Sequence, residues 1–97
     1  MDFELPIDKG FSIYSKPNCI NCIKVKKLLK DNKIEYKEII CDEYILERKE
    51  EFLEFIKNLI KKECKIFPII FLNGDFIGGY DETLLNIQKS LLNFEEF

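Results

Sequence analysis

Two cysteines at C-x-x-C spacing, Cys19 and Cys22, stand between a short apolar run that predicts a strand and a run that predicts a helix. At such a junction Cys19 lies at the helix N-terminus, where unpaired N–H groups and the helix dipole favour a thiolate and lower the thiol pKa. Cys22 lies one turn further along the same face, within reach of Cys19 for a disulfide. The pattern predicts thiol–disulfide exchange, with Cys19 attacking and Cys22 resolving. The spacing alone leaves two alternatives open, half of a zinc site and a pair of core cysteines.

The pattern along the chain predicts an α/β domain in the order β-α-β-α-β-β-α. The first strand is Phe11 to Tyr14, and the first helix begins after Pro17, because proline disfavours helical geometry in the residue before it. Asn73-Gly74 predicts a two-residue hairpin turn. The remaining elements are expected at residues 34–41 (strand), 44–63 (amphipathic helix), 68–72 and 75–77 (strands) and 81–92 (helix).

Length and composition indicate one globular domain over residues 1–97, with residues 1–10 as an N-terminal extension. The formal net charge of −3 argues against nucleic acid as a partner. No apolar run approaches the roughly 20 residues that span a bilayer, so we expect no membrane association. The first residues, which are acidic, do not form a secretory signal, and we therefore expect a reducing, cytoplasmic location. Histidine is absent, which removes histidine-based catalysis and Cys/His metal sites.

Three stretches carry a resemblance to a known family. Residues 14–22 resemble the active-site loop of the glutaredoxins, residues 66–71 their proline-led third strand, and residues 74–82 the glycine pair and acidic turn before their last helix. The resemblance covers about residues 11–92. It implies a thioredoxin-like fold, in which helices flank a four-stranded mixed sheet. It also implies a monomeric, glutathione-dependent thiol–disulfide oxidoreductase that reduces protein disulfides and glutathione mixed disulfides, with glutathione as co-substrate, no tightly bound cofactor and no metal.

The same resemblance implies a glutathione site beside the thiols. Its expected residues are Lys16, Asn21, Phe67, Pro68, Gly79, Tyr80 and Asp81. Lys16 would meet a carboxylate of the ligand and stabilise the thiolate, although a solvated lysine is the alternative. The Phe67–Pro68 bond is expected to be cis, as in the relatives, against an ordinary trans proline that starts a strand. Asp81 is expected at the N-cap or first position of the last helix, as a ligand contact, a capping residue or both.

Two positions depart from the family pattern. Ile20-Asn21 stands where the relatives often carry Pro-Tyr, and Ile66 replaces their usual threonine. The first departure resembles the glutaredoxin-like donors to ribonucleotide reductase that thioredoxin reductase reduces. The alternative functions are therefore such an electron donor or an iron–sulfur carrier module.

Cys41 and Cys64 stand outside the C-x-x-C motif. We expect both to be buried as small apolar residues. A second redox pair, or a zinc site made of all four cysteines, is the alternative.

Overall fold

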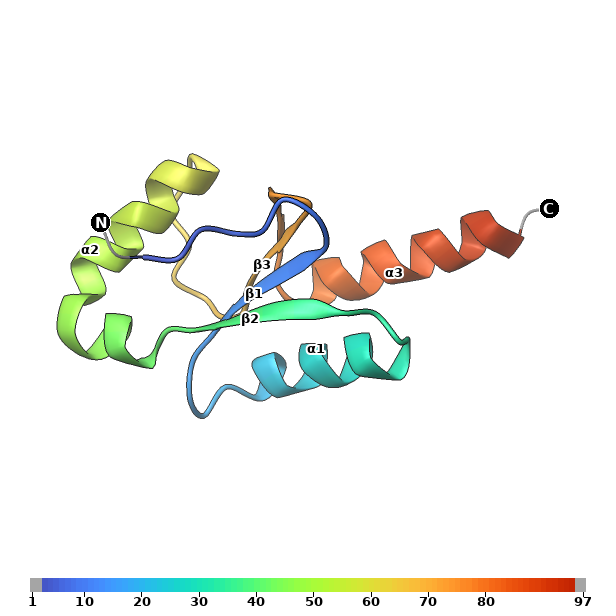
Figure 1. Ribbon diagram of the computed structural model, residues 1–97, viewed down its shortest axis with the longest axis horizontal. Coiled ribbons are helices and arrows are strands. Elements are labelled where there is room, and N and C mark those ends of the chain that lie inside the picture. Colours follow the sequence, from blue (N-terminus) through green and yellow to red (C-terminus); the bar gives the residue numbers. More distant parts are fainter. Residues whose placement is uncertain (1–2, 96–97) are drawn as a thin grey trace.

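The computed structural model describes residues 3–95, with side chains as far as residue 90 in the last helix. Met1 and Asp2 of the expected N-terminal extension lie outside the described residues, as do Glu96 and Phe97 at the other end of the single domain that we expect. The elements are β1 (Phe11–Ser15), α1 (Ile20–Asp31), β2 (Tyr36–Ile40), α2 (Asp42–Ile60), β3 (Ile69–Leu72), β4 (Asp75–Gly78) and α3 (Tyr80–Glu95) (Figure 1). The expected order of elements is confirmed.

The sheet has four strands in the order β2-β1-β3-β4. β1 pairs in parallel with β2 and antiparallel with β3, and β3 pairs antiparallel with β4, so the sheet is mixed, as expected. The β3–β4 connection is the predicted Asn73-Gly74 turn. Both residues have positive φ, 54° and 87°, which asparagine and glycine tolerate better than other residues.

Helices cover both faces of the sheet. On one face Val25 and Leu29 of α1 and Ile87 of α3 pack with Ile13 and Ile70. On the other face the side chains of α2 lie over β1 and β3, and this cluster contains Tyr14, Ile39, Phe52, Ile56, Ile69, Phe71, both cysteines of the C-x-x-C pair and Phe67. The dithiol is thus embedded in the α2 side of the core. The far end of α3 extends beyond the sheet (Figure 1).

Two helices begin at the same edge of the sheet, because β1 and β2 run parallel and end side by side. Ser15 lies opposite Ile40, and the N–H of Cys41 donates to the carbonyl of Ser15 at 2.9 Å. The chain enters α1 after β1 and α2 after β2. The C-x-x-C pair therefore sits at the carboxyl edge of the parallel strands.

The second helix differs from its prediction. It spans Asp42–Ile60 rather than residues 44–63, and Arg48 inside it has non-helical angles (φ −141°, ψ 44°). It ends at Lys61, whose φ of 67° is left-handed. The third strand likewise begins at Ile69 and not at Pro68, since proline has no N–H to donate to a ladder.

The residues before β1 are more than an extension. Phe3 is buried and contacts the rings of Tyr44, Phe52 and Phe55, with centroid distances of 4.9, 5.5 and 5.3 Å. The hydroxyl of Tyr14 donates to the carbonyl of Glu4 at 2.5 Å. This segment is therefore part of the core on the α2 side. Among the described residues, no helix combines the length and the apolar character needed to cross a membrane.

Candidate active site

Cys19 is the N-cap residue of α1, as the sequence predicts. Its backbone is extended (φ −114°, ψ 106°), and its Sγ accepts a hydrogen bond from the N–H of Cys22 at 3.2 Å. The two sulfurs form a disulfide, with 5.2 Å between the Cα atoms. Cys19 is 8% exposed against 2% for Cys22, so Cys19 is the more accessible residue of the pair. An N–H donor aimed at this sulfur stabilises negative charge on it, as a nucleophilic thiolate requires.

Lys16 and Phe67 face each other beside the dithiol. The Lys16 ammonium lies 5.7 Å from the centroid of the Phe67 ring. Phe67 itself is nearly buried in the cluster that holds Cys19 and Cys22. Lys16 is thus a cation at the mouth of the site, in contact with an aromatic ring.

The Phe67–Pro68 peptide bond is cis, which confirms the prediction. Pro68 is buried, and the ladder between β3 and β1 starts one residue later, at Ile69 opposite Tyr14. The backbone of Phe67 therefore lies outside the ladder and next to the dithiol cluster.

The glycine pair leads directly into α3. Gly78 has a φ of 127°, and a Cβ there would lie 2.7 Å from the Glu82 side chain. A Cβ on Gly79 would meet the carbonyl oxygen of Pro68 at 3.4 Å. The pair therefore allows β4 and the start of α3 to pass close to the cis proline.

The start of α3 corrects the expectation for Asp81. The helix begins at Tyr80, the N–H of Thr83 donates to the carbonyl of Gly79 at 3.1 Å, and Asp81 is the second helical residue and exposed. The cap comes from Glu82, whose Oε1 accepts from the Gly79 N–H at 2.9 Å. This backbone hydrogen bond lowers the pKa of Glu82. A glutamate reaches back across the first turn where an aspartate at position 81 does not, which is the capping-box pattern.

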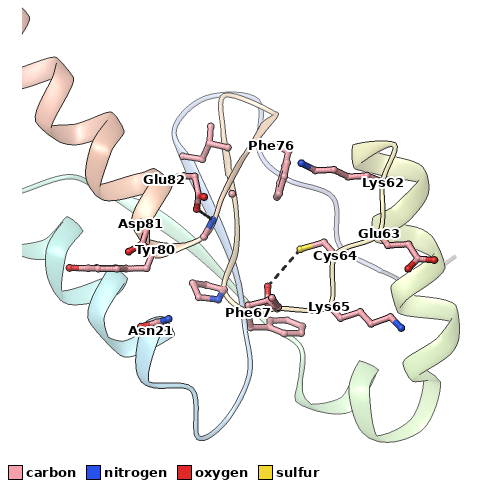
Figure 2. Close-up of a pocket in the computed structure, with 15 residues that line it drawn as sticks. Asn21, Lys62, Glu63, Cys64, Lys65, Phe67, Phe76, Tyr80, Asp81 and Glu82 are labelled. Atoms are coloured by element: carbon pink, nitrogen blue, oxygen red, sulfur yellow. Dashed lines mark hydrogen bonds between the residues drawn. The ribbon is translucent and has the colours of Figure 1, made fainter.

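A groove of about 580 Å³ joins these parts (Figure 2). Its lining includes Asn21, Phe67, Pro68, Gly79, Tyr80 and Asp81 of the expected glutathione residues. Lys16 is outside the lining and reaches the site through the Phe67 ring. The sequence reasoning missed the opposite wall, which is formed by residues 62–66 with Phe76, and it missed Glu82. A glutamate three residues after Gly79 is the capping signal that could have identified Glu82.

The two further cysteines have different surroundings. Cys41 is fully buried, as expected, and burial raises the pKa of its thiol to about 12, with the nearby Asp42 charge adding to the effect. Cys64 is half-buried rather than buried, because it lines the groove wall, where its sulfur lies 3.7 Å from the carbonyl oxygen of Ile66 (Figure 2). Among the side chains that the structure describes, in residues 3–90, no three Cys, Asp or Glu groups converge to hold a metal ion.

Comparisons with known proteins agree with this geometry. The glutaredoxin family profile matches residues 11–77. The chain belongs to the glutaredoxin family. Glutaredoxins are thiol–disulfide oxidoreductases, and the Cys19–Cys22 pair of this chain fits the C-x-x-C motif. The thioredoxin-like α/β fold expected from the resemblance is confirmed.

Individual relatives support the assignment to the family. The chain is 35% identical over 76 residues to the mitochondrial glutaredoxin-2 of Pongo abelii, a match that covers 78% of this chain and 45% of the relative. It is 35% identical over 79 residues to glutaredoxin 1 of Rickettsia felis, covering 79% of this chain and 70% of that one. The chain thus spans less than half the length of the mammalian relative.

Solved structures show the same fold. The crystal structure of glutaredoxin 1 from Francisella tularensis, complexed with cacodylate, superimposes with a TM-score of 0.71 at 26% identity. The superposition covers 84% of this chain and 94% of the other.

Proposed function

We propose that the chain is a glutathione-dependent thiol–disulfide oxidoreductase that reduces protein disulfides and glutathione mixed disulfides. The observation that carries this proposal is the position of Cys19. Its sulfur caps α1, accepts the Cys22 N–H and is the more exposed of the pair. Family membership supports the same chemistry.

The dithiol reduces a protein disulfide in two exchanges. The Cys19 thiolate attacks one substrate sulfur and forms a mixed disulfide, and the other substrate sulfur leaves as a thiolate that takes a proton from water. Cys22 then loses its proton to water, and its thiolate attacks the Cys19 sulfur and releases the second substrate sulfur as a thiol. Two electrons pass to the substrate, and the protein retains the Cys19–Cys22 disulfide. Two glutathione molecules restore the dithiol and leave as glutathione disulfide.

Glutathione mixed disulfides need only Cys19. Its thiolate attacks the glutathione sulfur, the protein thiol leaves, and a second glutathione then displaces the first from Cys19. Cys22 is nearly sealed from solvent at 2% exposure, so it can resolve a bond on Cys19 more easily than it can attack from outside.

The groove supports the glutathione part of the proposal. The Lys16 ammonium and the N-terminus of α3 provide two positive regions for the two carboxylates of the ligand. Phe67, with its backbone outside the β3 ladder, can pair with the extended tripeptide. Asn21, Pro68, Gly79, Tyr80 and Asp81 complete the walls. The buckwheat glutaredoxin was solved as a glutathione complex, which is consistent with a ligand site on this fold.

Partners and location follow from the same chemistry. The partners are glutathione and disulfide-bearing or glutathionylated proteins, and we expect the chain to act as a monomer with no nucleic acid or membrane partner. Reduced glutathione must be abundant for the cycle to turn, and we therefore propose a cytoplasmic location.

A second candidate is an electron donor that thioredoxin reductase reduces. Two positions favour it. Asn21 lines the groove without the aromatic surface that relatives offer to glutathione, and the Ile66 side chain is 79% exposed where they carry threonine.

One assay separates the two candidates. The chain is given a glutathione mixed disulfide and NADPH, either with glutathione and glutathione reductase or with thioredoxin reductase alone. We expect NADPH consumption in the first mixture, with a rate that depends on glutathione concentration. The Cys22→Ser variant should keep the activity on the mixed disulfide and lose the activity on a protein disulfide. If turnover requires thioredoxin reductase and its rate does not depend on glutathione concentration, the glutathione proposal is rejected and the chain is an electron donor.

A further inference from the structure

The wall of the groove opposite α3 has no role in the proposed glutathione site. The segment between α2 and β3 forms it, through Lys62, Lys65 and Ile66 (Figure 2). Figure 2 shows this segment facing Tyr80, Asp81 and Glu82 across the groove. The groove therefore runs from Asn21, inside the C-x-x-C motif, to Lys62.

Exposed isoleucines border the dithiol. Ile20 follows Cys19 directly and is 74% exposed, and Ile23, whose N–H donates to the Cys19 carbonyl at 3.2 Å, is 62% exposed. Ile66, next to Phe67 on the opposite side, is 79% exposed. Large apolar side chains gathered on a surface mark interaction sites. Here they are neighbours in the sequence of Cys19, Cys22 and Phe67.

Lysines also lie in and beside the groove, although the chain is acidic as a whole with a formal charge of −3. Lysine ammonium groups lie over three aromatic rings of the lining: Lys16 over Phe67 at 5.7 Å, Lys24 over Tyr80 at 4.6 Å and Lys62 over Phe76 at 5.3 Å. Lys65 adds an exposed cation on the outer side of the wall, where its side chain points away from Tyr80 (Figure 2).

The lining also contains three acidic residues, Glu63, Asp81 and Glu82, the last two on the α3 side. Glu82 is bonded to the Gly79 N–H, and Glu63 lies 4.0 Å from Lys57. An extended ligand that reaches past the glutathione residues thus meets lysines.

We propose that the preferred substrate is an extended protein segment whose disulfide-bonded cysteine has apolar neighbours and, further along the chain, acidic residues. The apolar neighbours contact Ile20, Ile23 and Ile66, and the acidic residues meet Lys62 and Lys65. The inference rests on the proposed function and names its protein substrates. Charge complementarity favours acidic over basic segments, and the isoleucines favour apolar over polar ones.

Three synthetic peptides test this. Each contains one cysteine in mixed disulfide with glutathione, so that Cys19 attacks the glutathione sulfur and the peptide leaves as a thiol. The first has leucines beside its cysteine and glutamates on both flanks, the second has lysines in place of the glutamates, and the third has serines in place of the leucines. A mixed disulfide of glutathione with cysteamine is the small reference substrate, and glutathione with glutathione reductase is the reductant. The readout is kcat/KM.

We expect the acidic peptide to exceed the basic one by about tenfold at about 0.05 M salt, with the ratio shrinking at about 0.5 M. The double variant Lys62→Glu, Lys65→Glu reverses the charge of this wall. Its kcat/KM should be higher for the basic peptide than for the acidic one, and its kcat/KM for the glutathione–cysteamine disulfide should be unchanged. Ile66→Ser should reduce the difference in kcat/KM between the leucine peptide and the serine peptide. Lys49→Glu is the control, because it reverses an exposed charge in α2 away from the groove. It should change neither the preference for acidic peptides nor the preference for leucine peptides.

The two proposals fail in different ways. Equal rates on all three peptides, or a preference that charge reversal does not alter, would overturn this inference while activity on the cysteamine disulfide upholds the proposed function. Absence of glutathione-dependent turnover on every substrate would overturn both.

Discussion

The starts of α1 and α2 hold the same chemical group in comparable places. Each helix follows one of the two parallel strands, and each has a cysteine at its N-cap, Cys19 before α1 and Cys41 before α2. Their neighbours differ in charge. Lys16 lies three residues before Cys19, whereas the carboxylates of Asp42 and Glu4 lie near the Cys41 thiol.

The two sulfurs also point to different partners. The extended backbone of Cys19 (ψ 106°) aims its sulfur at the Cys22 N–H, a donor that stabilises negative charge. Cys41 has a ψ of 15° and makes no capping bond, and its thiol donates to the carbonyl of Ile39 at 3.4 Å. A helix N-terminus is thus not enough to activate a thiol. Burial of the thiol, the backbone angles of the cap and the charges beside it decide whether the thiolate is stabilised.

Replacement of Cys19 or of Cys41 should give the largest difference in turnover. We expect Cys19→Ser to lower turnover on a glutathione mixed disulfide by on the order of 10³-fold or more, because a hydroxyl does not replace a thiolate nucleophile. Cys41→Ala should leave turnover unchanged. A coupled assay with NADPH measures both. A comparable loss in the two variants would show that the start of α2 takes part in the chemistry.

The raised pKa of Cys41 predicts a loss of stability in alkali. The pKa of about 12 in the folded state lies above about 8.5 for an unfolded thiol, so the contribution is complete below pH 8.5 and is lost as the pH rises toward 12. At pH 10 the loss is about 2 kcal/mol.

Urea unfolding of the reduced protein at pH 7 and pH 10 measures this loss. The drop in the free energy of unfolding should be about 2 kcal/mol smaller in Cys41→Ala than in the parent. Cys64→Ala, which removes the half-buried thiol, is the control and should keep the parent's drop. Equal drops in parent and Cys41→Ala would mean that the Cys41 thiol ionises in the folded state as readily as in the unfolded one.

Replacement of Lys16, the cation before Cys19, should have a smaller effect on catalysis than replacement of Cys19. We expect Lys16→Ala to raise KM for the glutathione mixed disulfide about fivefold with little change in kcat, because an exposed charge–carboxylate contact contributes about 1 kcal/mol. Lys49→Ala, remote from the groove, should leave KM unaltered. A fall in kcat instead of a rise in KM would assign Lys16 to the thiolate and not to the ligand.

The start of α3 is capped by a carboxylate, that of Glu82, and not by a cysteine. We expect Glu82→Ala to lower the free energy of unfolding by about 1 kcal/mol and Glu82→Gln, which keeps an oxygen acceptor for the Gly79 N–H, to lower it less. Asp81→Ala should cost less than Glu82→Ala. Thermal unfolding followed by circular dichroism ranks the three variants, and the reverse order would restore Asp81 as the cap.

Local rules account for the parts of the fold that the sequence predicted. The C-x-x-C spacing, the Asn73-Gly74 turn and the proline just before β3 each depend on neighbouring residues and allow few geometries. Burial of Phe3 and the break in α2 at Arg48 depend on contacts between distant residues, where the Arg48 guanidinium lies 4.6 Å from the Phe3 ring centroid. Asp81 is expected as the N-cap or first residue of α3, but the sequence pattern does not fix where the helix begins. It begins at Tyr80, so Glu82 at the third helical position reaches the Gly79 N–H.

Placement of Phe3 in the core changes what counts as the smallest unit that can fold alone. The family match covers residues 11–77, yet Phe3 belongs to one hydrophobic cluster and Ile87 to the other. A fragment cut to the family match would remove the Phe3 ring that contacts Phe52, remove the Glu4 carbonyl that accepts the Tyr14 hydroxyl, and delete the helix that packs with Ile13 and Ile70. Homology boundaries therefore underestimate the autonomous folding unit of this chain, and any truncated or grafted version must retain both flanks.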